Sequence, residues 1–541
     1  MNTAATNQRA AFANAEECRA WLTATSLGNP VQGQAQLLRQ LNLLNRQSIA
    51  ATERFTILEL LRKLTVNVQE EVARRFMGKA LPLVPPEHSA YDASQALWQA
   101  QLGGYVICIK AALAGDAALK SRLAQLIERA MTVLAAAQID IYRAGFQPRP
   151  EHWQALHELY ETAERTGIAK QDVEDRLRQG NRPTSVLSVY AEVMLLHAAS
   201  PHELPLRHFV WVARWAQRWA AKVSIQSSVP GADSPVRALC VDLASTEPAN
   251  YSVTGGSGMR WLDTAEVRLS LKKRLSLLDK GMAPAELQLG DDCVQPACGQ
   301  VLKRIYQRWC KGGIARSHER QAVSGTCEVI AGVDAIHYYL SGRKSFRQPG
   351  FADDEALRRD REELATFGRV TTATPEHFST QQGFRAEEWQ VIEEWQMVDE
   401  SATGIHVTQG VAQTNARMGQ GQLLALRPEG TQGLLLGCLR WTMVTNDARL
   451  HAGILVIPGQ PDAVAYRVMD TNNTQEPYRP GFLLPAITAL AAPVSIIVGS
   501  GMFKTGRPFE IITGKRQQRL RLLQLLDRGQ DYDRASFELV A

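Results

Sequence analysis

The 541-residue sequence has no long apolar run of the kind that crosses a membrane. Its longest apolar stretch, GFLLPAITALAAPVSIIV from Gly481, contains two prolines and several β-branched residues, so it predicts two buried strands. The N-terminal residues also lack the apolar core of a signal peptide. Eight cysteines are scattered without zinc-ligand spacing, even at the closest pair, Cys293 and Cys298. We therefore expect reduced, mostly buried thiols in a cytoplasmic protein with no membrane span.

Motifs of the common enzyme classes are missing as well. HExxH, GxSxG and CxxC patterns do not occur. The glycine-rich run VGSGMFKTG is no phosphate loop, because Phe503 and not glycine precedes Lys504. The net charge of +5 is small for this length, which argues against nucleic acid as a partner but allows one basic pocket. We expect no enzymatic activity, no catalytic residue, no metal ligand and no cofactor.

The first part of the chain, residues 1–222, has the spacing of amphipathic helices. Apolar positions recur three and four residues apart in segments beginning at Thr52, Asp116, His152, Val186 and Leu206. Thr52 and Asp116 are residue types that cap a first helical turn. We predict an all-α domain of stacked helical hairpins, similar to tetratricopeptide units although no 34-residue period is present. Such a layer either holds a protein partner or packs on the rest of the chain as a scaffold.

After residue 222 the sequence pattern indicates mixed helices and strands and then mainly strands, so the predicted fold class is a multidomain α+β protein. Residues 223–300 form a mixed α/β linking region, in which RALCVDLA (237–244) and EVRLSL (266–271) suggest strands. Residues 301–470 are predicted to form a barrel. It is interrupted by a short helix capped by Asp334 and ended by Gly342, and by a polar insertion at about 341–386. Residues 471–541 are predicted as a C-terminal β extension.

Two motifs in the β region carry chemistry. The sequence Asp399-Glu-Ser401-Ala-Thr-Gly404 lies between two strand-like runs and predicts a tight turn. Its carboxylate and hydroxyl are able to bond a base edge. Arg316 and Arg320 lie four residues apart just before another strand-like run, TCEVIAG. Guanidinium forks bind phosphate or the O6/N7 edge of guanine through paired hydrogen bonds.

An RxxxR pair before a first strand and a D/NxSxxG turn after a later strand resemble the PilZ domain, a six-stranded β-barrel. The strand-like runs GQLLALR, GLLLGCLRWTMV and LHAGILVI add to this resemblance over about 316–470. The resemblance implies a receptor for cyclic di-GMP, in which Arg316 and Arg320 hold guanine and phosphate. Asp399 and Ser401 would contact the base, and Gly404 would keep the turn open. It also implies an output in type IV pili, motility or exopolysaccharide, through a protein partner bound by the helical domain.

Two alternatives stay open at this point. Arg343 and Arg347 form a second RxxxR pair that is closer in sequence to Asp399. We prefer Arg316 and Arg320 because a plausible strand follows them directly. The barrel is alternatively a degenerate PilZ domain that binds protein and no nucleotide.

Overall fold

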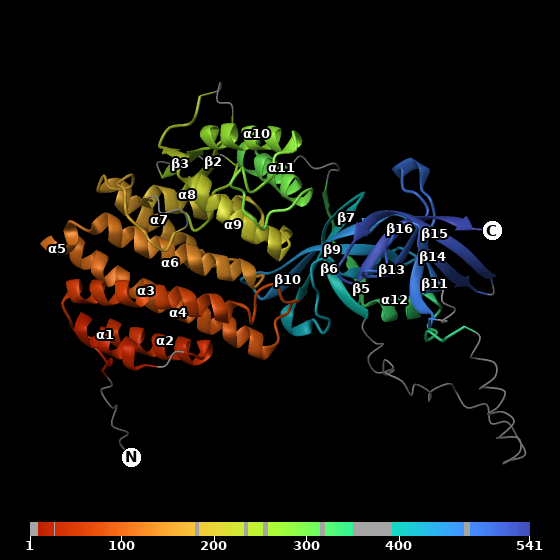
Figure 1. The fold of residues 1–541 in the computed structure, drawn as a ribbon, viewed down its shortest axis with the longest axis horizontal. Coiled ribbons are helices and arrows are strands. Elements are labelled where there is room, and N and C mark those ends of the chain that lie inside the picture. Colours follow the sequence, from red (N-terminus) through yellow and green to blue (C-terminus); the bar gives the residue numbers. More distant parts are fainter. Residues whose placement is uncertain are drawn as a thin grey trace, which may run out of the picture. The chain divides into compact units, whose positions relative to one another are not determined.

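A computed structural model describes residues 9–25, 28–178, 183–231, 236–252, 258–313, 320–349, 392–469, 476–514 and 516–540. The chain divides into two compact units (Figure 1). The first unit comprises residues 1–79 and 83–316, and the second comprises residues 80–82 and 317–541. Each unit is described by itself.

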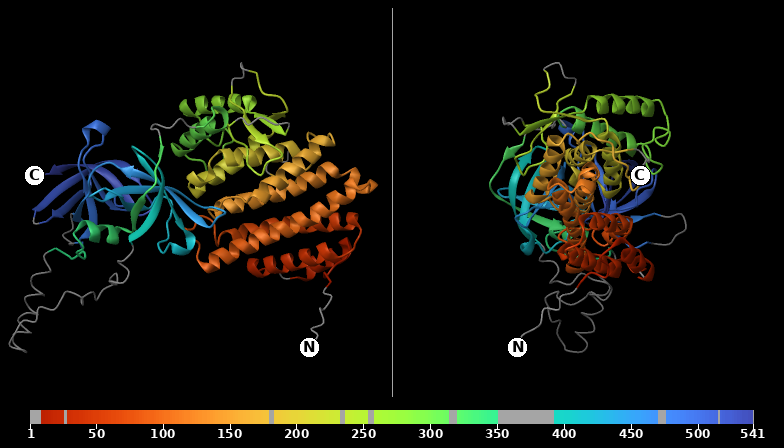
Figure 2. Two further views of the ribbon diagram at one scale, coloured as in Figure 1. Left: turned by 180° about the vertical axis from the view of Figure 1, so that it is seen from behind. Right: turned by 90° about the vertical axis from the view of Figure 1, so that its left-hand side faces the viewer.

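The first unit is built mainly from long helices that lie side by side (Figures 1 and 2). Their bounds are α1 (Ala15–Ala24), α2 (Pro30–Arg46), α3 (Ala51–Ala73), α4 (Pro85–Leu113), α5 (Ala117–Lys120), α6 (Leu123–Arg143), α7 (Pro150–Arg165), α8 (Val186–Ala198) and α9 (Leu206–Ala220). Helices are therefore confirmed in all five predicted segments. The cap at Asp116 is also confirmed, since its carboxylate accepts from the backbone N–H groups of Ala118 and Leu119, both at 3.1 Å. The cap at Thr52 was wrong, because α3 has already begun there.

Apolar periodicity explains how these helices pack. On α9 the indoles of Trp211, Trp215 and Trp219 recur every fourth residue and are buried. Trp215 donates from Nε1 to the carbonyl oxygen of Leu289 at 2.9 Å, which satisfies its one polar atom inside the core. The helical core continues without a break into residues 223–310. The linking region consequently packs on the helices as part of one unit.

A small three-stranded sheet and a helix pair complete the first unit. The sheet has the order β1-β3-β2, and the elements are β1 (Ser224–Gln226), β2 (Leu239–Asp242), β3 (Met259–Asp263), α10 (Ala265–Asp279) and α11 (Ala297–Cys310). The strand predicted over 237–244 is confirmed by β2. The strand predicted over 266–271 was wrong, because these residues lie in α10. Residues 266–271 alternate between polar and apolar, as in a strand. Over the full length of α10, however, the buried residues Val267, Leu271 and Leu278 have helical spacing.

The expectation of reduced thiols was wrong for one pair of cysteines. Cys293 and Cys298 are joined by a disulfide, since the turn before α11 brings their Cα atoms to 5.5 Å. The other six cysteines are free and buried.

The second unit begins with a six-stranded antiparallel barrel. Its elements are β4 (Gln321–Ala322), β5 (Thr326–Ala331), α12 (Val333–Leu340), β6 (Ile392–Ser401), β7 (Gly404–Gly410), β8 (Leu423–Pro428), β9 (Leu435–Val444) and β10 (Arg449–Ile457). Strands β6-β5-β8-β9-β10-β7 are hydrogen-bonded in that order, and β7 pairs again with β6 to close the ring. The short strand β4 pairs with β6 outside the ring. The strand-like runs GLLLGCLRWTMV and LHAGILVI supply β9 and β10, which pair as an antiparallel hairpin.

The predicted short helix after β5 is confirmed as α12, but its N-cap is Gly332 and not Asp334. Gly342 follows the helix with φ of 72°, as a glycine that ends a helix does. Residues 350–391, which include most of the predicted insertion, lie outside the described residues.

The C-terminal strands form a second closed barrel, which is more than the predicted extension. It has the order β11-β12-β13-β16-β15-β14, with β11 (Asp462–Val468), β12 (Arg479–Leu484), β13 (Ser495–Gly499), β14 (Pro508–Thr513), β15 (Arg516–Arg528) and β16 (Tyr532–Val540). The apolar stretch from Gly481 supplies β12 and β13, as predicted. Ile336 of α12 packs in one apolar cluster with Leu436 of the first barrel and Phe482 of the second, so the two barrels share a core. No helix in the described part of the chain is long and apolar enough to span a bilayer.

Candidate functional site

The motif from Asp399 to Gly404 forms the turn between β6 and β7. Ser401 pairs with Gly404 across it, and the Ser401 hydroxyl donates to the Gly404 carbonyl oxygen at 3.4 Å. Gly404 is not among the glycines with a positive φ, so its backbone conformation is open to other residues. The glycine is needed for a different reason. A Cβ atom there would lie 3.3 Å from the carbonyl oxygen of Ile454 on β10, which is tighter than most such contacts.

Asp399 is the centre of a polar chain on this sheet. Its Oδ1 forms an ion pair with Nη1 of Arg320, and its Oδ2 bonds Nδ1 of His406 at 3.1 Å. The Arg320 and Asp399 side chains are 28% and 25% exposed. Arg320 reaches this position because it directly precedes β4, in which Ala322 pairs with Asp399. The chain continues from Nε2 of His406 to Nδ1 of His451 at 3.0 Å.

The histidine chain fixes which oxygen of Asp399 is available. Burial, and next the neighbouring His406, lower the pKa of His451, so His451 is neutral at pH 7. A neutral His451 can donate from Nδ1 to His406, whose own Nδ1–H then donates to Asp399. The Oδ2 atom is thereby occupied inside the protein. A ligand that bonds Oδ1 of Asp399 would have to displace Arg320 from it.

The register of the barrel places four residues in one row across neighbouring strands. Asp399 of β6 pairs with His406 of β7, His406 pairs with Gly453 of β10, and Gly453 pairs with Trp441 of β9. Directly paired residues project from the same face of a sheet. His406 is partly exposed while its neighbours Ile405 and Val407 are buried in the barrel, so the row lies on the outer face.

The arginines of the two predicted pairs occupy different places. Arg316 lies outside the described residues. Arg343 and Arg347 are exposed residues that follow α12, and Arg343 lines a cavity of about 290 Å³ together with Ile392 at the start of β6. Asp399 lies seven residues further along β6, which corresponds to roughly 23 Å at ~3.3 Å per residue. Among the arginines that the structure describes, Arg320 contacts Asp399, whereas Arg343 lies near the opposite end of β6.

Sequence reasoning missed most of the row. The sequence motifs do not include His406, Trp441 or His451. Their sequence separation from Asp399 gives no signal, because only the closure of the barrel brings them together. No cluster of three or more potential metal ligands occurs in the described ranges.

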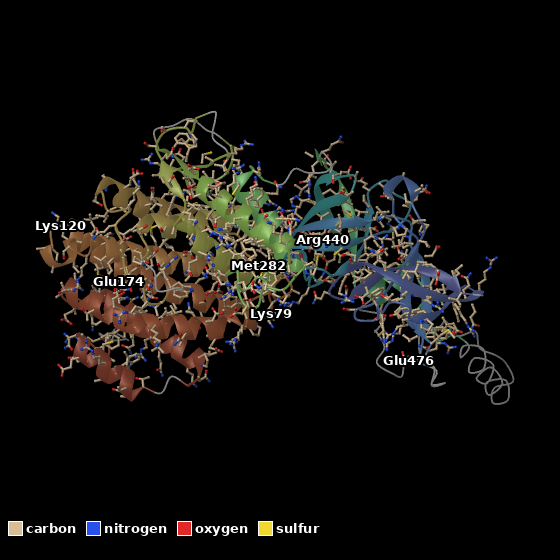
Figure 3. All side chains as sticks on the ribbon, turned by 45° about the horizontal axis from the view of Figure 1, so that its top comes forward. Lys79, Lys120, Glu174, Met282, Arg440 and Glu476 are labelled. Carbon is tan, nitrogen blue, oxygen red and sulfur yellow. A yellow bond between two sulfur atoms is a disulfide. The ribbon has the colours of Figure 1, made fainter. Side chains whose placement is uncertain are left out.

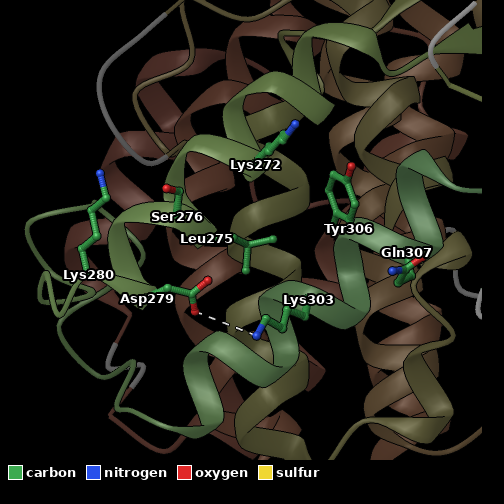
Figure 4. A pocket seen from close by; sticks show the side chains of 8 residues that line it. All are labelled: Lys272, Leu275, Ser276, Asp279, Lys280, Lys303, Tyr306 and Gln307. Carbon is green, nitrogen blue, oxygen red and sulfur yellow. Dashed lines mark ion pairs between the residues drawn. The ribbon is translucent and has the colours of Figure 1, made fainter.

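A second candidate is a groove in the first unit, between α10 and α11 (Figure 4). The cavity measures about 570 Å³ and is lined by Lys272, Leu275, Ser276, Asp279, Lys280, Lys303, Tyr306 and Gln307. The one ion pair drawn across it joins Lys303 and Asp279 at 3.9 Å, and both side chains are about two-thirds exposed. Met282, which follows α10 in the chain, is exposed (Figure 3). Residues 265–311 have nine lysines and arginines against five acidic residues, a net charge of +4 where the whole chain has +5.

These features define a class of protein, in which a helical unit is followed by two antiparallel six-stranded barrels with a polar row on the first. Three family models match the chain in order. They are the cyclic-di-GMP receptor FimW N-terminal domain over residues 16–231, its middle PilZ domain over 240–391, and the FimW C-terminal beta-barrel domain over 464–540. The chain is also 22% identical to the cyclic-di-GMP receptor FimW of Pseudomonas aeruginosa strain PAO1, over 94% of this chain and 88% of the relative.

The chain belongs to the FimW family of cyclic-di-GMP receptors, which have a helical N-terminal domain and a PilZ middle domain. This is a family of receptors and not of enzymes. The predicted resemblance to PilZ proteins and the predicted fold class are thereby confirmed. The middle-domain match contains both arginine pairs, β5 and α12, and ends at residue 391, directly before β6. The turn motif at Asp399 therefore lies between the middle and C-terminal matches.

Proposed function

We propose that this chain binds cyclic di-GMP on the outer face of its first barrel, at the position of the Arg320–Asp399 pair. The observation that carries the proposal is that pair itself. Residues that are 79 positions apart in sequence meet because β4 pairs with the end of β6. Arg316 and Arg320 would hold guanine and phosphate, Asp399 and Ser401 would contact the base, and Gly404 would leave the turn close to β10.

The chemistry of the pair suits an exchange of partners. Without ligand, Arg320 neutralises Oδ1 of Asp399. A phosphate is a strong bidentate partner for a guanidinium, and the N–H groups of a guanine edge are partners for a carboxylate. Binding would replace one ion pair by two sets of charge-assisted bonds. It would also draw the arginine segment onto the barrel, which is a change that a partner protein can detect.

Isothermal titration of cyclic di-GMP into the intact protein tests the proposal. Binding near micromolar corresponds to about −8 kcal/mol. We expect loss of binding in Arg316→Ala/Arg320→Ala and normal binding in Arg343→Ala/Arg347→Ala. The opposite pattern would assign the site to the second arginine pair. A folded protein that binds no cyclic di-GMP would instead support the alternative, a PilZ scaffold that recognises protein alone.

We further propose that the first unit binds a protein partner, through which the signal controls pili, motility or exopolysaccharide. The groove between α10 and α11 supports this, because its excess of lysines complements an acidic segment of a partner. Polyglutamate should displace those partner proteins that bind the groove of the unmodified protein. The triple variant Lys272→Glu/Lys280→Glu/Lys303→Glu should no longer capture these proteins. The matched control reverses three exposed lysines on other helices or loops, Lys110, Lys120 and Lys170. Equal capture by both variants would refute the groove as the docking surface.

A further inference from the structure

The second barrel has an apolar hairpin tip at residues 485–494, which we name the β12–β13 tip. Its sequence, PAITALAAPV, contains no charged side chain and one hydroxyl group, that of Thr488. All of its residues except Ile487 and Ala492 are exposed to solvent, and Leu490 is 56% exposed. Contiguous apolar surface of this kind marks an interaction site.

The backbone of the β12–β13 tip satisfies many of its own hydrogen bonds. Ile487 and Ala492 form a bridge, in which the N–H of each donates to the carbonyl oxygen of the other at 2.9 and 3.1 Å. The N–H groups of Leu490 and Ala491 donate to carbonyl oxygens within the tip, both at 3.1 Å. Its two prolines have no N–H to satisfy. The tip can therefore leave water with fewer unpaired backbone groups than an open loop, which is what an apolar phase requires.

The register of the barrel places further apolar side chains at the same end. β13 begins at Ser495 opposite Ser536 of β16, so the tip and the last residues of β16 leave the barrel together. The described residues of the second barrel have five exposed large apolar side chains, and all are in the tip or in the paired ends of β15 and β16. They are Leu490, Val494, Leu523, Leu539 and Val540.

Arginines lie beside these apolar side chains. Arg519 and Arg521 are exposed and belong to the stretch of β15 that pairs with the end of β16. Glu538 of β16 forms an ion pair with Arg521 at 3.9 Å, and both side chains are 52% exposed. Glu510, opposite Arg519 on β14, is already paired with Arg467. Arg519 consequently has no ion pair within the described residues and is able to bind an external anion.

We propose that this end of the second barrel binds the surface of a bilayer that contains anionic phospholipids. The β12–β13 tip enters the interfacial region, and Arg519 and Arg521 contact lipid phosphates. The composition of the tip favours lipid over a protein partner, because protein interfaces are built around aromatic anchors and the tip has no aromatic residue. Since the two barrels share a core, the bilayer would hold the first barrel at its surface. The inference does not depend on binding of cyclic di-GMP.

Co-sedimentation of the full chain with vesicles tests the proposal. The vesicles consist of phosphatidylcholine alone or of an equal mixture of phosphatidylcholine and phosphatidylglycerol. We expect binding to the mixed vesicles and weaker binding to phosphatidylcholine alone. Leu490→Asp should weaken binding to the mixed vesicles about 10- to 150-fold, because it replaces an exposed apolar anchor by a charge. Val229→Asp, at an exposed valine of the first unit, is the control and should bind normally.

The arginines are tested by a pair of charge reversals. Arg519→Glu/Arg521→Glu should weaken binding to the mixed vesicles about fivefold or more for each arginine. The matched control, Arg479→Glu/Lys504→Glu, has the same change in net charge. Arg479 begins β12 and Lys504 follows the end of β13, so both lie at the opposite end of the barrel. An equal loss in the two double variants would show a response to net charge alone and would overturn the proposed surface.

A fluorophore on the tip distinguishes lipid from other occupants. The six free cysteines are buried, so an environment-sensitive dye should react selectively with Ala489→Cys. Mixed vesicles should shift its emission to shorter wavelength, whereas the same dye on Val229→Cys should not respond. A shift that follows protein concentration without vesicles would identify a second copy of the chain as the occupant and overturn the proposal. Normal vesicle binding by a folded Leu490→Asp variant, or no vesicle binding by the unmodified protein, would also overturn it.

Discussion

Replacing Asp399 by Asn separates the ligand-binding role of this residue from its role in stability. Asn preserves the shape of the side chain and can still accept from His406, but it removes the negative charge. The Arg320–Asp399 pair is about one-quarter exposed at both side chains, so solvent screens it. Such pairs stabilise a fold by about 1 kcal/mol or less. We expect Asp399→Asn to lower the free energy of unfolding by no more than that.

The effect on ligand binding should be much larger. A hydrogen bond to a charged group contributes about 1.5–3 kcal/mol, so the dissociation constant of cyclic di-GMP should rise about 10- to 150-fold. Isothermal titration and urea unfolding on the same samples measure both quantities. The matched control is Glu328→Gln, which breaks the ion pair with Arg427 in the same barrel and should leave binding unchanged. The reasoning would be refuted if Asp399→Asn cost more than 3 kcal/mol of stability and left the affinity unaltered.

Three further predictions concern stability. Burial lowers the pKa of His152 to about 4 and also lowers that of His157, so unfolding takes up protons below pH ~6.5. The stabilisation from the neutral His152 is complete above that pH, and it should fall by about 1.4 kcal/mol per pH unit as pH drops toward 4. His157 adds a loss in the same direction. Urea unfolding at a series of pH values measures the fall, and a flat profile would contradict this. Trp215→Ala should cost about 3–5 kcal/mol by calorimetry, and a loss below 1 kcal/mol would show that the site collapses. Gly404→Val should destabilise the second unit by about 1–3 kcal/mol through contact with Ile454, and an unchanged melting temperature would contradict the close approach.

The helices and most barrel strands were predictable because their signals are local. The buried tryptophans of α9 recur every fourth residue, and β8, β9 and β10 follow one another with short connections. EVRLSL shows the limit of this method. Six alternating residues fit a strand, whereas the fifteen residues of α10 fit a helix. The disulfide between Cys293 and Cys298 depends on the turn before α11, which residue spacing alone does not define.

The motifs of the proposed site are visible in the sequence, whereas the contacts around them are not. Asp399 and Arg320 were chosen because their residue types suit a guanine nucleotide, and their ligand role stays a prediction. The contact between Asp399 and His406 depends on the register of β6 against β7, and Trp441 joins the row only because β9 and β10 complete the ring. A bulge shifts that register at each end of the row, and a bulge has no reliable local sequence signal.

Hydrogen exchange with mass spectrometry, with and without cyclic di-GMP, tests the location of the site most directly. It uses the intact, unmodified protein. We predict that ligand slows exchange in peptides covering 320–322, 397–406 and 439–453, which contain β4, the β6–β7 turn and the β9–β10 hairpin. Protection confined to residues 338–343, near the opposite end of β6, or to α10 and α11, would contradict the account.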